Sequence, residues 1–397
     1  MADLSVEFAG LKLSNPFMLA SAPPTNNGEM IQRAFEAGWG GAITKTLALE
    51  PARDVQPRLG HTADGKRLIG FENIELITQR ELDVWCKDIA EIKKNYPDHV
   101  LLASLMAAVQ QDDWHELVAQ VEEAGVDGLE INLGCPHGMP EKGMGAIQGQ
   151  DPEIAGRVTK WVKEVAKTPV MVKLTPNVTD LPLIARAVEA AGADAISAIN
   201  TVLCLIGVDL DTFEPLPSVA GYSSFGGYSG PAVKPIGLRC VAQLAQSTRV
   251  PISGIGGISR WQDAAEYILV GASTVQLCTA VMFRGYRIID RLTKGLSRYM
   301  DEKGLASVSE MVGKTLPRLV AHEALDFDYK VVAAIDEALC TGCRLCVTAC
   351  YDGGWQAIEM TETEEVPRVL LDKCDGCSLC LHVCPVDGAI SMMVRAS

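Results

Sequence analysis

The sequence predicts an α/β protein in which a (β/α)8 barrel is followed by a small α+β domain. Short apolar runs alternate with amphipathic stretches of helix length through about the first 280 residues, which indicates βαβ units around a parallel sheet. Eight of the 13 cysteines then fall near the end of the chain, in two runs of near-identical spacing. The fingerprint Gly-x-Gly-x-x-Gly of a doubly wound dinucleotide-binding sheet occurs nowhere in the chain.

Eight predicted strands account for the barrel, because each is apolar and ends in small or polar residues, where a barrel carries its chemistry. The strands are residues 17–21, 41–46, 100–106, 128–133, 169–174, 195–200, 251–254 and 274–278. Helices are expected at residues 113–124, 151–166, 181–190, 236–245 and 261–269. Gly125, Gly192 and Gly271 each follow a predicted helix, and we expect each to end its helix and lead into the next strand. The alternative, an open doubly wound sheet, is disfavoured by the missing fingerprint.

Three segments are expected along the chain: a barrel over residues 1–310, a linker over 311–330 and a small domain over 331–397. The stretch 285–330 has the character of a closing helix and linker, with Pro317 as a helix breaker. In the small domain, residues 357–360 and 368–371 are expected to form short strands.

Composition excludes several classes of protein. A chain of 397 residues with 48% hydrophobic content can build more than one packed core. A net charge of −15 argues against nucleic acid as a partner, since phosphate binding needs clustered Lys and Arg. The first residues lack the basic and apolar segments of a secretory signal, and no apolar run approaches the roughly 20 residues that span a bilayer. We therefore expect a soluble, cytoplasmic protein that binds neither nucleic acid nor membrane.

The two cysteine runs predict iron–sulfur clusters. They are Cys340-x2-Cys343-x2-Cys346-x3-Cys350 and Cys374-x2-Cys377-x2-Cys380-x3-Cys384-Pro385. This is the spacing of bacterial ferredoxins, in which thiolates hold two [4Fe–4S] clusters and the fourth cysteine of each run ligates the other cluster. By that rule, cluster one is held by Cys340, Cys343, Cys346 and Cys384, and cluster two by Cys374, Cys377, Cys380 and Cys350. The chain is therefore predicted to carry single electrons.

Structural zinc and disulfide bonds are the alternatives for these cysteines. Zinc sites pair two Cys-x2-Cys units to supply four tetrahedral ligands, whereas each run here holds four cysteines of its own. Disulfide bonds need an oxidising compartment, and nothing in the sequence suggests export. Two complete copies of the ferredoxin spacing favour the clusters.

The ends of the predicted strands carry the candidate active-site residues, because chemistry in a (β/α)8 barrel occurs where the strands end. Lys45 and Lys173 lie at two strand ends, and a cation near a flavin ring can stabilise its anionic reduced form. Two late strand ends, at Gly256–Gly257 and Cys278–Thr279, can cradle a phosphate with their backbone. Each feature alone is compatible with a solvated lysine or a simple turn, but the whole set favours a site for a flavin.

These motifs resemble the FMN barrel of the dihydroorotate and dihydropyrimidine dehydrogenases, and most closely the second. The resemblance is carried by Asn132-Leu-Gly-Cys135-Pro136-His137-Gly138, Lys173-Leu-Thr-Pro-Asn177, Asn200-Thr201, Gly256-Gly257 and Asn73-Ile74-Glu75-Leu76-Ile77. Residues 135–145 resemble the mobile active-site loop of that family, and the ferredoxin-like tail resembles its C-terminal end. The resemblance covers nearly the whole chain and implies the smaller, bacterial two-subunit form of dihydropyrimidine dehydrogenase.

The resemblance also implies a role for each matching residue. Cys135 matches the acid that protonates C5 of the pyrimidine, while reduced FMN delivers hydride to C6. The residues that match the pyrimidine site are Asn73, Glu75, Ile77, Asn132, Asn200 and Thr201. Those that match the flavin site are Ala20, Ser21, Lys45, Thr46, Lys173, Gly230, Gly256, Gly257, Cys278 and Thr279. One departure is Gly134, where the larger enzymes have Ser beside the cysteine, so any role of that hydroxyl is lost or moved here.

The residue types suit the reduction of uracil or thymine at the 5,6 double bond. A thiol is largely protonated at neutral pH and can serve as the acid. Asn amides match both the donors and the acceptors of the ring, and the Glu75 carboxylate can accept from a ring N–H. Glu75 would repel the carboxylate of dihydroorotate, which disfavours a biosynthetic dihydroorotate dehydrogenase. A ferredoxin-like carrier with a barrel as docking scaffold is the remaining alternative, and the dense set of strand-end residues disfavours it.

The clusters imply a partner, because this chain has no nicotinamide site of its own. The resemblance implies a second subunit that binds FAD and NAD(H), and a homodimer of this chain within a heterotetramer. Electrons would pass between the flavin of this chain and the partner through the two clusters.

Overall fold

The computed structural model describes residues 2–135, 143–362 and 365–395, which divide between two compact units, Met1–Leu319 and Val320–Ser397. The predicted boundaries at residues 310 and 330 remain predictions. Each unit is described by itself below.

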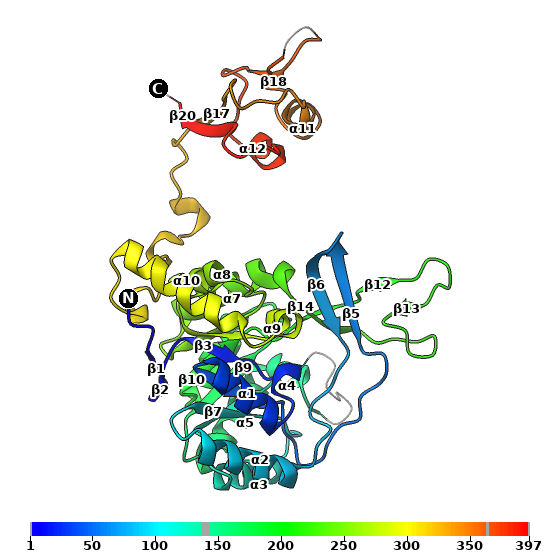
Figure 1. Ribbon diagram of the computed structural model, residues 1–397, viewed down its shortest axis with the longest axis vertical. Coiled ribbons are helices and arrows are strands. Elements are labelled where there is room, and N and C mark those ends of the chain that lie inside the picture. Colours follow the sequence, from blue (N-terminus) through cyan, green and yellow to red (C-terminus); the bar gives the residue numbers. More distant parts are fainter. Residues whose placement is uncertain (1, 136–142, 363–364, 396–397) are drawn as a thin grey trace. The chain divides into compact units, whose positions relative to one another are not determined.

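The first unit is a closed barrel of eight parallel strands, which confirms the predicted fold (Figure 1). The strands close in the order β10, β15, β16, β3, β4, β7, β8 and β9. In chain order they are β3 (Phe17–Leu19), β4 (Gly41–Ile43), β7 (Val100–Leu105), β8 (Gly128–Asn132), β9 (Val170–Leu174), β10 (Ala195–Ala198), β15 (Ile252–Ile255) and β16 (Ala272–Leu277). Each lies within, or within one or two residues of, a predicted strand.

Helices cover the outside of the barrel with apolar faces turned inward. They are α1 (Gly28–Ala37), α2 (Leu82–Asn95), α3 (Gln111–Glu123), α4 (Ala146–Gly149), α5 (Pro152–Val165), α6 (Leu181–Ala190), α7 (Lys234–Ser247), α8 (Trp261–Leu269), α9 (Thr279–Arg284) and α10 (Ile288–Lys303). In α3, Trp114, Leu117, Val118 and Val121 recur at helical spacing and are buried. The glycines after α3, α6 and α8 have φ of 97°, 98° and 114°, so each ends its helix in the left-handed conformation, as predicted.

A hairpin of β1 (Val6–Phe8) and β2 (Leu11–Leu13) closes one end of the barrel, and the sequence did not predict it. Phe8 and Leu13 are buried in one apolar cluster with residues near the starts of the strands, among them Met18 and Met171. The amino-terminal ends of the strands are thereby sealed, so the carboxyl ends form the open mouth.

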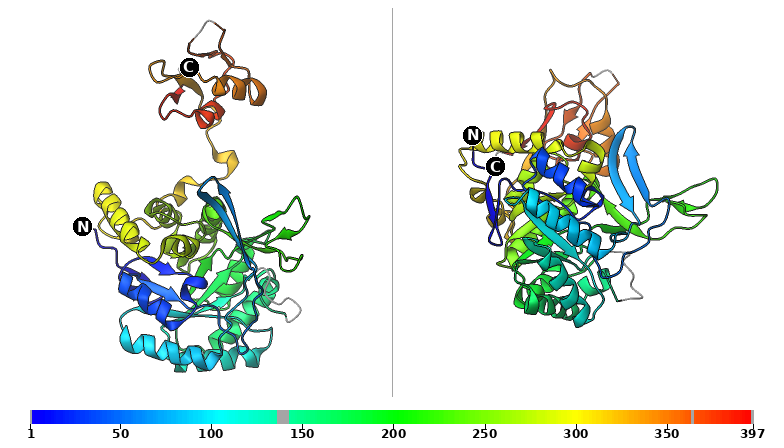
Figure 2. Two further views of the ribbon diagram at one scale, coloured as in Figure 1. Left: turned by 45° about the vertical axis from the view of Figure 1, so that its right-hand side comes forward. Right: turned by 60° about the horizontal axis from the view of Figure 1, so that its bottom comes forward.

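A second sheet stands out from the barrel at that mouth, and it too was not predicted. Its strands are β5 (Leu59–Asp64), β6 (Arg67–Asn73), β11 (Val202–Cys204) and β14 (Gly226–Ser229), antiparallel in the order β11, β14, β6, β5. A short pair, β12 (Gly207–Val208) with β13 (Pro215–Leu216), continues from it, and both views of Figure 2 show this pair projecting from the barrel. We call β5, β6, β11 and β14 the outer sheet; it joins the segment after β4 to the segment after β10.

The second unit is a small α+β fold. The strands expected at 357–360 and 368–371 form as β18 (Ile358–Glu359) and β19 (Arg368–Val369), and a pair not predicted, β17 (Val331–Ile335) with β20 (Ile390–Val394), frames them. The helices α11 (Leu345–Gly353) and α12 (Leu379–Val383) each begin inside a cysteine run. In neither unit does any of the described helices have the length and apolarity of a bilayer span.

Candidate active site and cluster sites

Every candidate residue predicted in the barrel lines one cavity of about 700 Å³ at the mouth. The barrel strands bring Ala20, Ser21, Lys45, Thr46, Asn132, Cys135, Lys173, Asn200, Thr201, Gly256, Gly257, Cys278 and Thr279; the outer sheet and its flanks bring Asn73, Glu75, Ile77 and Gly230. Parallel strands present their carboxyl ends at one edge, which is why residues so far apart in the sequence meet. A cavity of this volume is typical of sites for small molecules and cofactors.

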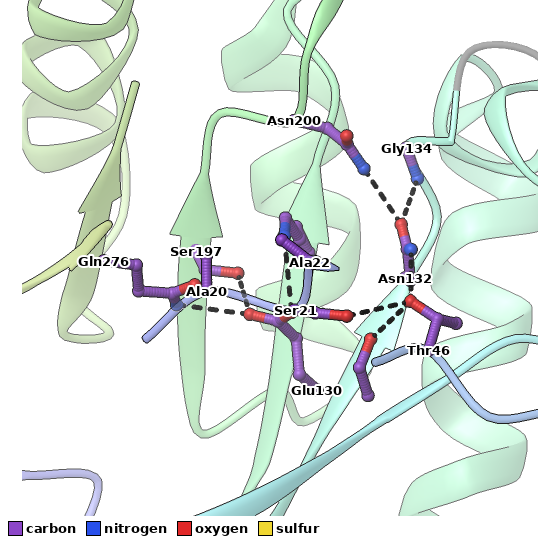
Figure 3. A network of polar contacts seen from close by, with 12 residues as sticks. Ala20, Ser21, Ala22, Thr46, Glu130, Asn132, Gly134, Ser197, Asn200 and Gln276 are labelled. Atoms are coloured by element: carbon purple, nitrogen blue, oxygen red, sulfur yellow. Dashed lines mark hydrogen bonds and ion pairs between the residues drawn. The ribbon is translucent and has the colours of Figure 1, made fainter. Parts of the chain in front are cut away.

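The Thr46 hydroxyl is the centre of a polar network on one wall of the cavity (Figure 3). Its oxygen lies 3.0 Å from the Ser21 and Ser104 hydroxyls and accepts from Asn132 Nδ2 at 3.0 Å. Asn132 Oδ1 in turn accepts from Asn200 Nδ2 at 2.9 Å. The two asparagine side chains are therefore oriented by the protein before any ligand binds, which lowers the entropic cost of binding.

Gly134 is required by the closeness of Asn200. Its N–H donates to Asn132 Oδ1 at 3.2 Å, and an added Cβ would lie 2.8 Å from Asn200 Cβ and 2.9 Å from Asn200 Nδ2. A side chain at this position would displace Asn200. The larger enzymes have Ser at this position. In this chain, Gly134 leaves the space that the Asn200 side chain occupies.

We expect Gly134→Ser to raise the KM for the predicted pyrimidine substrate about tenfold, since it breaks the Asn200–Asn132 hydrogen bond in the wall that is predicted to bind the ring. Steady-state turnover against pyrimidine concentration measures the effect. Gly156→Ala is the control, because the added Cβ there meets its nearest atom, the Ala187 carbonyl oxygen, at an ordinary 3.4 Å. Unchanged kinetics in Gly134→Ser would show that Asn200 does not bind the ring.

Glu75 is buried between two cations. Lys45 Nζ lies 3.2 Å from Glu75 Oε2, and Arg58 Nε lies 3.6 Å from Glu75 Oε1. Burial without such partners would make a carboxylate costly. The prediction that Glu75 repels a substrate carboxylate is weakened by this finding, because the two cations offset its charge; its value as a hydrogen-bond acceptor for a ring N–H remains. Arg58 is a residue that the sequence reasoning missed.

Lys173 has a buried carboxylate partner that the sequence reasoning also missed. Its Nζ lies 3.5 Å from Oε1 of Glu130, whose side chain is fully buried inside the barrel. Oε2 of Glu130 accepts from Ser197 Oγ at 2.9 Å and from Gln276 Nε2 at 3.2 Å (Figure 3). The signal in the sequence was a polar residue inside each apolar strand. The Glu130 carboxylate therefore provides a negative charge beside Lys173, on the side of the barrel interior.

The cavity fits a flavin on two observations. Gly257 has φ of 73°, and an added Cβ would lie 2.8 Å from the Lys234 backbone nitrogen, so only glycine leaves this close turn open. Gln276 Oε1 is buried without a hydrogen-bond partner among the described residues and belongs to a side chain that lines the cavity. A ligand N–H can satisfy this acceptor, and Lys45 and Lys173 provide positive charge in the same wall. Burial raises the pKa of the neighbouring Cys278 thiol to about 11, so that residue stays neutral.

Cys135 lies in an apolar corner of the cavity. It belongs to one buried cluster with Ile77, Met106 and Met144, and its carbonyl oxygen accepts from the Ala146 N–H. These apolar neighbours exclude water from one side of the thiol. Of the predicted active-site loop, residues 136–142, including His137 and Gly138, lie outside the described residues, whereas Gly143, Met144 and Gly145 are described.

In the outer sheet, the buried Glu72 pairs with the partly buried Cys204. Cys204 Sγ donates to Glu72 Oε1 at 3.3 Å, and burial raises the pKa of both groups, that of Cys204 to about 12. This contact joins β6 to β11 and therefore has a structural role.

In the second unit, one small pocket is lined by Cys340, Cys343, Cys346 and Cys384. These are the four cysteines assigned to cluster one, three from the first run and the fourth from the second. Burial is the main cause that raises the pKa of Cys380, and Cys374, Cys377 and Cys350, its expected partners in cluster two, raise it further. In the described part of the chain, no three Cys, His, Asp or Glu side chains are set to hold a single metal ion.

Comparison with known proteins agrees with both units. Residues 3–300 match the family model for dihydroorotate dehydrogenase, and residues 333–392 match that of a 4Fe–4S dicluster domain. The chain is 43% identical over 388 residues to the NAD-dependent dihydropyrimidine dehydrogenase subunit PreA of Escherichia coli K12, covering 97% of this chain and 94% of that one.

Two further relatives match less of the chain. The chloroplastic dihydropyrimidine dehydrogenase (NADP(+)) of Arabidopsis thaliana is 42% identical over 337 residues, which cover 81% of this chain and 79% of that protein. The catalytic subunit of dihydroorotate dehydrogenase B (NAD(+)) of Pyrococcus abyssi is 39% identical over 317 residues, which cover 99% of that protein and 79% of this chain.

Proposed function

The chain belongs to the dihydroorotate dehydrogenase family, and from that premise we propose that it is the catalytic subunit of an NAD-dependent dihydropyrimidine dehydrogenase. The proposed reaction is the reversible reduction of the 5,6 double bond of uracil or thymine. The similarity to PreA supports it, because it extends over 97% of this chain and so includes the cysteine runs, whereas the dihydroorotate dehydrogenase relative matches 79%. The cavity at the mouth, which collects every candidate residue of the barrel, is the structural observation that carries the proposal.

In this proposal the ring lies against the wall formed by Asn132, Asn200 and Thr201. Asn73, held by its bond to the Gly227 carbonyl oxygen at 3.2 Å, and Glu75 contact its amide edge from the outer sheet. Ile77 packs beside Cys135 and excludes water from the thiol. Cys135 Sγ gives its proton to C5 and takes one back from solvent after each turnover.

Residues of the barrel would hold FMN as the prosthetic group. Its ring would lie near Lys45 and Lys173, and its phosphate near Gly256, Gly257, Cys278 and Thr279; Ala20, Ser21, Thr46 and Gly230 complete the site. When bound, FMN supplies the hydride for C6. Glu130 then holds the Lys173 side chain in place inside the barrel through their ion pair, because a buried charge is costly without an opposite charge beside it.

The cysteines would hold two [4Fe–4S] clusters, which move electrons singly between this chain and a partner that binds FAD and NAD(H). The ligand sets are those predicted from the spacing, and the four cysteines that line one pocket support the first set. A partner subunit is further supported by the relative PreA, which is named as a subunit. We propose a dimer of this chain within a heterotetramer, located in the cytoplasm.

Turnover of uracil compared with orotate tests the proposal, with an artificial reductant in place of the partner. We expect uracil turnover at least about 100-fold above that of orotate, because a site built to hydrogen-bond one ring rejects a poorly matched one. Glu75→Gln should lower kcat/KM for uracil about 100-fold, since the ring N–H then meets a neutral amide oxygen in place of a buried, charged carboxylate. Lys87→Gln on the exposed face of α2 is the matched control. Preference for orotate would support dihydroorotate dehydrogenase instead, and a preparation with iron but no flavin would support an electron carrier.

A further inference from the structure

The two cysteine runs place matched residues around the two cluster sites, so the sites can be compared position by position. Gly342 and Gly376 have φ of 65° and 76°. Arg344 and Ser378, each directly before a helix, both have φ of 64°. The two halves of the unit therefore match at two backbone positions between the first cysteine of each run and the start of the helix.

The segments packed against the two runs are matched as well. An added Cβ at Gly376 would lie 2.4 Å from the Val331 carbonyl oxygen, and one at Gly342 would lie 2.7 Å from the Glu365 carbonyl oxygen. Val331 in one half therefore corresponds to Glu365 in the other.

Two residues further along each segment, Ala333 corresponds to Pro367. Only Ala333 has a backbone N–H that can donate a hydrogen bond. The Ala333 N–H donates to Cys374 Sγ at 3.5 Å. Pro367 lines one pocket with Cys340, the counterpart of Cys374, but proline has no backbone N–H. The Cys340 sulfur therefore receives no hydrogen bond from this position.

We propose that Pro367, by withholding this hydrogen bond, holds the reduction potential of cluster one below that of cluster two. Hydrogen bonds to cluster sulfurs are among the factors that set cluster potentials, and a donor stabilises the more negative, reduced form most. The inference rests on the proposed assignment of two clusters. It makes the two clusters unequal: an electron shared between them resides mainly on the one held by Cys374.

Exposed charged residues shift the two cluster potentials in the direction opposite to the effect of Pro367. Measurements at high salt distinguish the two effects. Arg344 lines the pocket of cluster one, and the corresponding residue at cluster two is the uncharged Ser378. Asp375 lies beside cluster two, and the corresponding residue at cluster one is the uncharged Thr341. Both differences favour an electron on cluster one. Arg344 and Asp375 are exposed to solvent, so their influence is screened at high ionic strength, whereas a short hydrogen bond is not.

Redox titration of the full chain, loaded with flavin and clusters and followed by electron paramagnetic resonance, tests the proposal at low salt and at 1 M salt. Pro367→Ala adds the missing N–H. We expect the ratio of reduced to oxidised cluster one to rise about tenfold at a fixed potential, which corresponds to about 59 mV for a one-electron couple. The potential of cluster two should not move. Electron–nuclear double resonance should show a new exchangeable proton at cluster one, lost in D2O.

Matched variants keep the test decisive. Pro367→Gly adds the same N–H without a side chain and should shift the potential alike. Ala333→Pro removes the N–H that donates to Cys374 and should lower the potential of cluster two, leaving that of cluster one unchanged. Arg344→Ser should lower the potential of cluster one by an amount that fades in 1 M salt. Unmoved potentials in a protein that retains both clusters, or a shift without the new proton, would overturn the inference. Fewer than two clusters in the wild-type chain would instead contradict the proposed function.

Discussion

Cys135→Ala is expected to lower kcat for uracil reduction by a factor of about 1,000, since a positioned general acid typically contributes 100- to 10,000-fold. The KM for uracil should change little, because Asn132, Asn200 and Glu75 still hold the ring. Steady-state turnover with an artificial reductant measures the effect, and flavin absorbance of the purified variant shows that the cofactor site is intact. Cys135→Ser should retain a small part of the rate, because a hydroxyl is a weaker acid than a thiol.

Cys86→Ser is the matched control for this prediction. The Cys86 thiol lies on α2, outside the cavity, and donates to the Gln120 carbonyl oxygen at 3.7 Å. A hydroxyl can make the same contact, so full activity is expected. If Cys135→Ala kept the wild-type rate, the proton would have to come from another group, and the role assigned to Cys135 would be wrong.

Cys346→Ser is expected to separate the two halves of the reaction. Cys346 is buried among the ligands assigned to cluster one, and losing it should abolish that cluster. NADH-dependent reduction of uracil in the complex with the partner subunit should then fall at least about 100-fold, because the electron path crosses the cluster. A single turnover of uracil by the photoreduced flavin of the same variant should proceed at the wild-type rate.

Thr348→Ala, on the exposed side of the same helix, controls for damage to the fold and should leave both rates unchanged. Iron content and the paramagnetic spectrum establish the loss of the cluster. NADH-dependent turnover that survived this loss would mean that the cluster lies off the path to the nicotinamide.

The barrel could be predicted from the sequence because its strands are short and mostly apolar, and most of them end in small or polar residues. Glu130, Ser197 and Gln276 escaped the prediction because they sit inside such strands, and a sequence does not show which inward positions share one layer. The outer sheet escaped it for another reason. Its strands come from residues 59–73 and 202–229, and antiparallel pairing between such distant, partly exposed segments has no local signal.

The cluster ligands could be predicted because their spacing is itself the chemical signature. The difference between the two cluster sites could not be predicted from the sequence, because it depends on which backbone segment packs against each cysteine run. Ala333 precedes the first cysteine run and Pro367 lies between the two runs, and only the packing of Gly376 on Val331 and Gly342 on Glu365 shows that they correspond.

The hairpin of β1 and β2 has a consequence for the order of events at the active site. With the floor of the barrel sealed by Phe8 and Leu13, the cavity has its doorway at the mouth. Uracil and its dihydro product must therefore pass through the same doorway, one after the other, and cannot occupy the site together. Reducing equivalents need no such passage, since they would travel through the protein. Substrate and product therefore exchange at the mouth of the barrel, whereas electron transfer needs no opening to solvent.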